Sequence, residues 1–197
     1  DTSGYLISRS LGIQFTKDKG NQFSQQHPAE NLAGQHLTSI RFSNSHLGIA
    51  IGYRKKIYRT TDGGTSWNMV SYVGTQGNNS LKPIQFVSKD VGFVGTYPTT
   101  IFLTINAGAT WLPPRKTTYQ DGPKFSDQNS ITALYFHTAL KGCGFTDGFN
   151  DQFYTEDGGE TINAQRGMSF EEPKMCFLDS TIGAVFSTDA RFISQQP

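Results

Sequence analysis

The sequence predicts an all-β protein, a β-propeller of four-stranded blades with about five partial or complete blades in this chain. Three observations predict this fold. A short motif recurs along the chain, a glycine precedes every copy at a nearly constant distance, and β-branched and aromatic residues fill the segments between turn residues. Repeats of roughly 40 to 50 residues that each hold four strands are typical of propeller blades. We therefore expect a single propeller domain over residues 1–197.

The recurrent motif is clearest at Thr60–Trp67, which reads Thr-Thr-Asp-Gly-Gly-Thr-Ser-Trp. Close copies stand at Thr104–Trp111 and Thr155–Ile162, and a weaker copy stands at Thr16–Phe23. The first threonines of successive copies are 44, 44 and 51 residues apart. Because each repeat is one structural unit, this spacing gives the length of a blade.

A glycine stands 12 or 13 residues ahead of each motif and provides a second, independent marker. Two markers that move together are not explained by chance similarity, and they divide the chain into repeat units. The glycines are Gly4, Gly48, Gly92, Gly142 and, continuing the series, Gly183. The units cover about 1–36, 37–80, 81–130, 131–172 and 173–197.

Each full unit is expected to hold four short strands, separated by Gly, Asn, Asp or Ser. The first unit starts at its second strand and the last ends at its third, so we expect a propeller that is incomplete at both ends; the alternative is an unusual closure of five compressed blades. The predicted strands are 37–43, 48–53, 56–61 and 67–73 in the second unit, 83–87, 92–96, 100–104 and 111 onward in the third, and 131–137, 142–146, 152–155 and 162 onward in the fourth.

The residue types of the motif suit a tight turn between the third and fourth strands. The Asp or Asn at the third position accepts backbone hydrogen bonds across the turn, and the glycine two residues later takes a positive φ. The closing aromatic residue returns to the sheet and buries apolar surface. We expect these residues to maintain the fold and to take no direct part in binding or catalysis. They are Asp18, Gly20, Phe23, Asp62, Gly64, Trp67, Asn106, Gly108, Trp111, Asp157, Gly159 and Ile162.

The motif resembles the Asp-box, or BNR, repeat, whose pattern is Ser/Thr-x-Asp-x-Gly-x-x-Trp/Phe. The resemblance covers nearly the whole chain. Families with this repeat include sialidases, sortilin-type receptors, xyloglucanases and the photosystem II stability/assembly factor group. The run Ile57–Trp67 is most similar to the last group and its bacterial relatives. The resemblance implies a propeller whose Asp boxes lie away from the functional site, and it names no function.

Composition excludes several classes of protein. The formal net charge is +1, with 17 basic and 16 acidic residues, which argues against a nucleic-acid binder. No apolar run approaches the roughly 20 residues that span a bilayer, so membrane insertion is not expected. Charged residues make up only 17% of the chain, and the aromatic-rich, weakly charged composition suits an exported protein, periplasmic, cell-surface or secreted, whose leader is not part of this chain.

No cofactor or metal is expected. The histidines His27, His36, His46 and His137 are scattered, and none pairs with a carboxylate or cysteine at metal-ligand spacing. Two cysteines, Cys143 and Cys176, are too few for a disulfide framework. They are either two buried thiols or one disulfide.

Binding is expected on the propeller face opposite the Asp boxes, where long loops join successive blades. These loops are 24–35, 74–81, 113–129 and 166–172. A cationic and aromatic cluster falls at the turn between the second and third strands of the second unit, and two cations lie in a loop on the same face. This cluster predicts a docking patch for an acidic peptide or loop or for an anionic sugar, and its alternative is a solvated turn. It comprises Tyr53, Arg54, Lys55, Lys56, Arg59, Arg115 and Lys116.

The function predicted is a non-catalytic scaffold that binds a protein partner or assists assembly. One alternative is a glycan-acting hydrolase, which would need two opposed carboxylates. The candidates for these carboxylates are Asp147, Asp151, Glu171 and Glu172, although the Arg-Ile-Pro motif that sialidases carry is missing. A second alternative is a structural subunit of a secreted or surface multi-protein machine.

Overall fold

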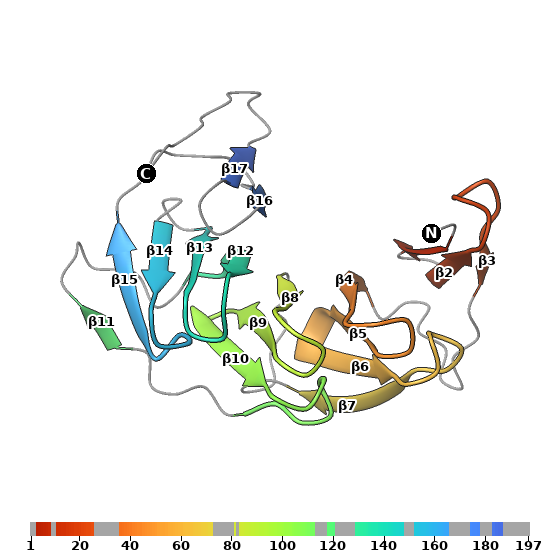
Figure 1. The fold of residues 1–197 in the computed structure, drawn as a ribbon, viewed down its shortest axis with the longest axis horizontal. Coiled ribbons are helices and arrows are strands. Elements are labelled where there is room, and N and C mark those ends of the chain that lie inside the picture. The colour runs from red at the N-terminus through yellow and green to blue at the C-terminus, as the bar shows by residue number, and fades with distance from the viewer. Residues whose placement is uncertain are drawn as a thin grey trace.

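The structure, a computed structural model, describes residues 3–8, 11–25, 36–72, 81, 83–112, 118–120, 129–147, 152–165, 174–177 and 183–186. Within these ranges the protein consists of β-strands and one turn of 3-10 helix, η1 (Tyr53–Lys55). The strands form five separate sheets, which we call units 1 to 5 in chain order. The sheets follow one another along an arc (Figure 1), as successive blades of a propeller do.

Units 2 and 4 contain complete four-stranded antiparallel blades, with strands in chain order from the inside of the arc to the outside (Figure 1). Unit 2 contains β4 (Leu37–Phe42), β5 (Gly48–Gly52), β6 (Lys56–Thr60) and β7 (Asn68–Tyr72). Unit 4 contains β12 (Ile131–Phe136), β13 (Gly142–Thr146), β14 (Gln152–Thr155) and β15 (Thr161–Gln165).

Fewer strands form the other three units within the described residues. Unit 1 contains β1 (Gly4–Ser8), β2 (Gly12–Thr16) and β3 (Ser24–Gln25). Unit 3 contains β8 (Ile84–Phe86), β9 (Gly92–Thr96) and β10 (Thr100–Thr104), and unit 5 contains β16 (Lys174–Phe177) and β17 (Gly183–Phe186). The strands predicted for units 2, 3 and 4 are confirmed to within one residue, apart from the fourth strand of unit 3.

Within the described residues that fourth strand contributes a single bridge, between Leu103 and Leu112, and residues 113–117 lie outside them. Pro113 and Pro114 follow at once, and proline offers no N–H to a strand ladder. The segment 113–129 was predicted to be a loop throughout, and this is wrong for β11 (Thr118–Gln120). β11 pairs in parallel with β15 and adds a fifth strand to the sheet of unit 4.

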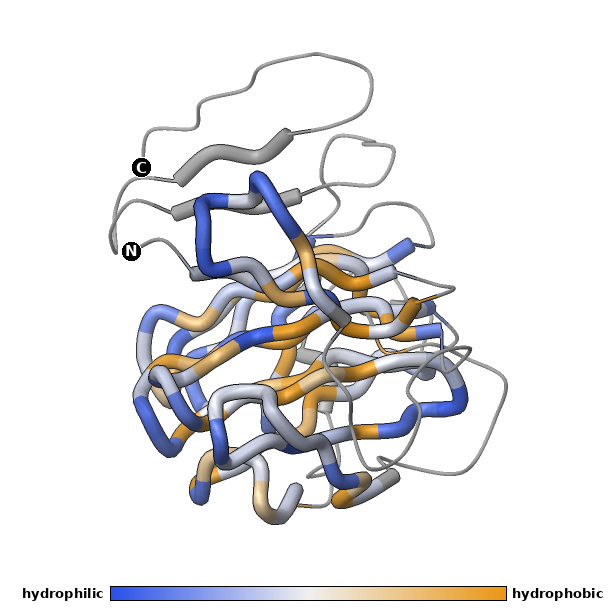
Figure 2. Tube along the Cα trace, turned by 90° about the vertical axis from the view of Figure 1, so that its right-hand side faces the viewer, coloured by the Kyte–Doolittle hydropathy of each residue, from blue (hydrophilic) through white to orange (hydrophobic). Residues whose placement is uncertain are grey.

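The core lies between neighbouring units, because the second strands of units 2 and 3, β5 and β9, are buried on both faces along their whole length. In β5, Ile49 and Ile51 pack into the cluster shared with unit 3, whereas Ala50 packs into the cluster shared with unit 1. A third cluster joins units 3 and 4 around Phe93 and Phe136. Each fully buried aliphatic side chain contributes about 1.5–3 kcal/mol. In Figure 2 the hydrophobic residues accordingly lie along the strands and the hydrophilic residues lie at the turns.

Phenylalanine rings on the neighbouring inner strand leave no room for a Cβ at the marker glycines of units 2, 3 and 4. A Cβ at Gly48 would lie 2.7 Å from the ring of Phe42, and a Cβ at Gly92 or Gly142 would meet a ring in the same way. Phe42 cannot easily move, because it stacks on Tyr5 with ring centroids 4.3 Å apart. The six-residue spacing from Phe to Gly is a repeat signal in its own right, and Phe177 and Gly183 of unit 5 show it too.

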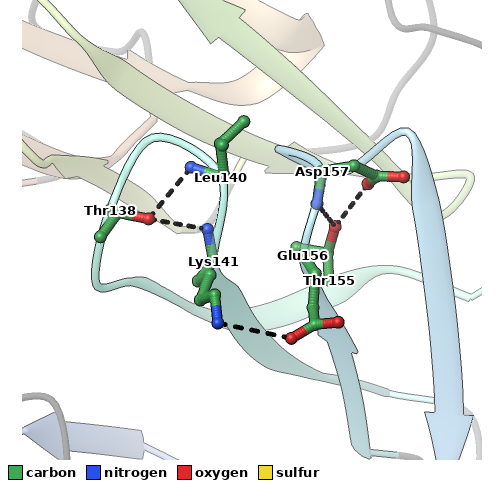
Figure 3. Close-up of polar contacts among 6 residues, drawn as sticks. All are labelled: Thr138, Leu140, Lys141, Thr155, Glu156 and Asp157. Carbon is green, nitrogen blue, oxygen red and sulfur yellow. Dashed lines mark hydrogen bonds and ion pairs between the residues drawn. The ribbon is translucent and has the colours of Figure 1, made fainter.

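A polar side chain closes the turn between the first and second strands in each of units 2, 3 and 4. In unit 4 the Thr138 hydroxyl accepts hydrogen bonds from the backbone N–H groups of Leu140 and Lys141, as Figure 3 shows. Asn44 and Ser88 do the same in units 2 and 3. These bonds fix the turns at the end of the molecule where the Asp boxes also lie.

Substitution of Gly48 by alanine should destabilise the protein by about 1–3 kcal/mol, because the new methyl group would overlap the packed Phe42 ring. Gly4 holds the equivalent position in unit 1, where a Cβ would meet only Thr16 Cγ2 at an ordinary 3.5 Å. Gly4→Ala is therefore the matched control and should unfold at nearly the wild-type urea concentration. Equal losses in the two variants would contradict the ring-packing explanation.

Candidate functional site

In each described Asp box the hydroxyl of the first threonine makes the central hydrogen bonds of the turn. Thr60 Oγ1 donates a hydrogen bond to Asp62 Oδ1 at 2.7 Å and accepts one from the backbone N–H of Gly64 at 2.8 Å. The Thr60 side chain is only 1% exposed, so both bonds are shielded from water. The boxes that begin at Thr16, Thr104 and Thr155 repeat both bonds with lengths of 2.7 to 3.0 Å.

The third position of the box accepts hydrogen bonds across the turn, as its residue type predicts. Asp62 Oδ1 accepts from the backbone N–H of Ser66 at 2.9 Å. Asn106 Oδ1 accepts from Thr110 in the same way at 2.9 Å, so an amide oxygen replaces the carboxylate without loss of the bond.

Two successive residues of each box have positive φ, one more than the sequence predicted. Gly64 has φ 87°, and Gly63 before it has φ 69°. The residue before the predicted glycine is Lys19 in the first box and Ala107 in the third, with φ 61° and 53°. A side chain in this conformation costs roughly 1–2 kcal/mol, so the surrounding hydrogen bonds must hold it there.

The Asp boxes of units 2 and 3 also bond to the unit before them, which sequence reasoning missed. The hydroxyl of Tyr5 in unit 1 donates to the carbonyl oxygen of Gly63 in unit 2. Arg59 Nε in unit 2 donates to the carbonyl oxygen of Ala107 in unit 3 at 2.9 Å. The one available signal was the bulky residue that follows the marker glycine, such as Tyr5 or Ile49.

The closing residue of the box faces the preceding unit. Trp67 and Ile162 are fully buried, and Trp67 Nε1 donates to the carbonyl oxygen of Gly64 at 3.1 Å. Phe23, by contrast, is 45% exposed, so the prediction of a buried closing aromatic is wrong there. The physical reason is that Phe23 belongs to unit 1, and no described unit precedes it. The indole N–H of Trp111 is buried and has no hydrogen-bond partner.

The box carboxylates are more acidic than ordinary aspartates. Hydrogen bonds from Thr16 and from the Gln22 backbone lower the pKa of Asp18. Burial raises the pKa of Asp62, but hydrogen bonds from Ser66 and Thr60 outweigh it and leave the pKa lowered. In Asp157, too, burial is outweighed by hydrogen bonds from Thr161 and Thr155, so its pKa is lowered. All three carboxylates therefore stabilise the turns in their charged form.

The predicted docking cluster begins on the face opposite the Asp boxes, at the other end of β6. The turn there is η1, in which Arg54 and Lys55 have positive φ of 59° and 57°. Arg54 is exposed, with its guanidinium 5.8 Å from the centroid of the Tyr53 ring. Lys56 is partly buried beside this turn. Tyr53, Arg54 and Lys56 thus lie together at one edge of the loop face.

Other members of the predicted cluster do not share that surface. Lys55 is only 4% exposed, and this burial lowers its pKa. Arg59 lies toward the Asp-box end of β6, where its side chain reaches unit 3. A run of charged residues in the sequence does not show which way each side chain points. Here the left-handed turn at Arg54 and Lys55 and the strand that follows direct the cationic side chains to different places. Arg115 and Lys116 lie outside the described residues.

On the loop face, hydrogen bonds from threonine hydroxyls and from one backbone N–H hold the residues that lead into units 3 and 4. The hydroxyl of Thr38 in unit 2 donates to the carbonyl oxygen of Leu81, and the Leu81 N–H donates to the Gly52 carbonyl oxygen at 3.3 Å. In unit 3 the hydroxyl of Thr99 donates to the carbonyl oxygen of Asn129 at 2.8 Å. These links fix the entries to units 3 and 4 on that face.

Among the candidate catalytic carboxylates, only Asp147 falls within the described residues. Its Oδ1 accepts from the Ser130 N–H at 2.7 Å, and its own N–H donates to the Ser130 carbonyl oxygen at 3.0 Å. This carboxylate thus closes the entry to unit 4. Asp151, Glu171 and Glu172 lie outside the described ranges.

Metal and thiol chemistry find little support in the described parts of the chain. These residues contain no group of three or more His, Cys, Asp or Glu side chains placed to hold a metal ion. Cys143 is a free thiol, and burial raises its pKa to about 11, which makes it a poor nucleophile. The side chain of Cys176 is not described. No helix in the described ranges is long and apolar enough to cross a membrane.

The free energy of unfolding should fall as the pH drops below about 4, because carboxylates with lowered folded-state pKa values must then be protonated. Their contribution is fully present above the unfolded value of 3.8 and is lost as the pH falls through the lower folded value. Urea unfolding from about pH 6 to about pH 2 measures this loss.

Two reciprocal variants test the role of the boxes. Asp62→Asn should make the acid decline shallower, because an amide keeps the Ser66 bond without titrating. Asn106→Asp should make the decline steeper, because the new carboxylate can accept hydrogen bonds from Thr110. The same pH profile in both variants as in the wild type would refute the assignment.

The chain is similar to one known protein family and to several solved structures. Residues 31–115 match the family described as photosynthesis system II assembly factor YCF48. The structure of YCF48 bound to D1 peptide is 15% identical, with 98% of this chain and 64% of that chain covered and a TM-score of 0.64. YCF48 from Cyanidioschyzon merolae is 14% identical, with 100% and 67% covered and a TM-score of 0.70.

A xyloglucanase of family GH74 from Xanthomonas campestris is 12% identical, with 94% of this chain and 34% of that chain covered and a TM-score of 0.68. A search of curated proteins gives no match. The chain spans 64% of the first YCF48 structure and about a third of the xyloglucanase. At these identities the likeness establishes the fold, which is a β-propeller.

The hydrogen bonds of the four Asp boxes and the blade-by-blade order of the sheets agree with these matches. The chain is therefore an Asp-box (BNR) repeat β-propeller, and it resembles the photosystem II assembly factors in particular.

Proposed function

We propose that the chain is a non-catalytic scaffold that holds a segment of a partner protein during assembly. The observation that carries this proposal is the match of residues 31–115 to an assembly-factor family. The similar YCF48 structure that is bound to a D1 peptide supports peptide binding by such a propeller. The matched region contains all of unit 2 and the Tyr53–Lys55 turn.

The two faces of the propeller differ in which polar groups remain available to bind a partner. On the Asp-box face, the threonine hydroxyls and one oxygen of each Asp or Asn are already used within the turns. On the loop face, Arg54 is exposed over Tyr53, and Leu81 at the entry to unit 3 is hydrogen-bonded to unit 2. A fixed surface with an exposed guanidinium and a tyrosine ring suits an acidic peptide segment.

Reversal of charge at Arg54 and Lys56 to glutamate should weaken binding of an acidic peptide at least fivefold and reduce its salt dependence, because both cations lie on the loop face. Fluorescence anisotropy with a labelled glutamate-rich peptide measures both effects. Lys17→Glu is the matched control, since Lys17 is exposed at an Asp box and the net charge change per site is the same. Equal weakening by the control would indicate a general charge effect and would contradict the proposed face.

A glycan-acting hydrolase is the second candidate, and the fold similarity to GH74 enzymes favours it. A hydrolase would release sugar from xyloglucan, whereas a scaffold would not, and one assay distinguishes the two. Reducing-sugar release from xyloglucan should stay at the level of the buffer blank if the chain is a scaffold. Turnover that disappears in Asp147→Asn would establish the hydrolase instead.

A further inference from the structure

Charge is distributed unevenly along the chain. Residues 31–89 contain seven Lys or Arg residues and a single acidic residue, Asp62, whereas basic and acidic residues nearly balance over the whole chain. Asp62 belongs to the Asp box, where its carboxylate accepts hydrogen bonds within its own turn. The opposite end of unit 2, where η1 lies, therefore receives no carboxylate from residues 36–61.

His36 lies against the turn η1 at this end of unit 2. Its carbonyl oxygen accepts a hydrogen bond from the Tyr53 N–H at 3.2 Å. Its ring meets the Tyr53 ring edge to face, with the centroids 6.0 Å apart. The backbone of His36 has a positive φ of 48°, a conformation that histidine adopts more readily than most side chains. The backbone bond and the ring contact together hold an exposed imidazole beside Tyr53.

The Tyr53 ring thus has an imidazole and a guanidinium beside it. The guanidinium carbon of Arg54 lies 5.8 Å from the ring centroid. The two centroid distances place the imidazole within about 12 Å of the guanidinium, a span of about four residues of an extended peptide. One acidic segment can therefore reach both groups at the same time.

The two groups differ in how their charge depends on pH. Arginine stays charged throughout, whereas histidine is the side chain whose charge ordinarily changes between pH 5 and pH 8. A protonated His36 adds a second cation beside the ring. The charged groups of the adjoining elements β4 and η1, and of the start of β6, are all cations, namely Arg41, Arg54, Lys55 and Lys56. Burial lowers the pKa of Lys55, so its charge must be considered in any test.

We propose that His36 is a pH-dependent part of the docking site on the loop face, where its protonated imidazole binds a carboxylate of an acidic partner segment beside Arg54. The inference rests on the docking function proposed above and specifies the regulation of that site. A segment that prefers the imidazolium binds most tightly where His36 is protonated, and its affinity falls as the pH rises and the proton is lost. Partner binding should therefore tighten as the pH falls.

Fluorescence anisotropy with a labelled glutamate-rich peptide tests this inference at about pH 5.5 and about pH 8, at one ionic strength. The peptide is acetylated and amidated, and glutamate ordinarily ionises near pH 4.3, so the charge of the probe stays nearly constant. The wild-type chain should bind at least threefold more tightly at the lower pH. His36→Asn should bind at both pH values as weakly as the wild type does at pH 8, because asparagine accepts the positive φ without a charge. His36→Arg should bind tightly at both.

His46 provides the matched control, because it is an exposed histidine of the same unit on the Asp-box face. Its carbonyl oxygen accepts a hydrogen bond from the Gly63 N–H at 2.9 Å. His46→Asn should retain the full pH dependence. Dependence that persists in His36→Asn would belong to another group, such as Lys55, and would overturn the inference, as would equal loss in both variants. Binding without pH dependence in the wild type overturns this inference alone, whereas no binding at either pH overturns the docking function as well.

Discussion

The fold depends on one buried hydroxyl that is repeated in every Asp box. Thr60 Oγ1 satisfies a backbone N–H and orients a carboxylate in the same turn, so a hairpin with two consecutive positive-φ residues becomes stable. A buried N–H without such a partner would cost about 1–3 kcal/mol. The turn also directs a carbonyl oxygen outward to the preceding unit, where Tyr5 or Arg59 donates to the equivalent oxygen. The local turn and the joint between blades are therefore one structure.

The joints in turn explain the strict spacing of the sequence. A second strand such as β5 is buried on both faces, so little space remains between it and the inner strand. The phenylalanine ring of the inner strand fills that space. Glycine at the strand start follows from this packing. In unit 3 the side-chain amide of Gln85 even donates to the carbonyl oxygen of Phe136 at 2.8 Å, so one side chain joins two inner strands. Stability in such an array comes from each unit and its neighbours.

The same constraints show why the fold was predictable and the site was less so. Strand positions in units 2 and 4 could be read within one residue because two markers, Thr60 and Gly48 in unit 2, repeat in step with the blades. Side-chain direction has no such marker. Lys55 and Arg59 stand next to exposed cations in the sequence, but one lies buried at a left-handed turn and the other reaches the next unit. Phe23 fits the motif and is exposed because burial of that position depends on a neighbouring blade.

The outer strands are where this architecture can change without loss of its core. Ile101 and Phe102 are buried by units 2 and 4 and by their own sheet. In unit 4, β11 adds a fifth strand outside β15, so the outer edge of a blade can differ while the clusters between units stay packed. The inner strands have no such freedom, because their side chains fill the joints. A propeller of this kind can thus keep its Asp boxes for the fold while loops and outer edges diverge to bind partners.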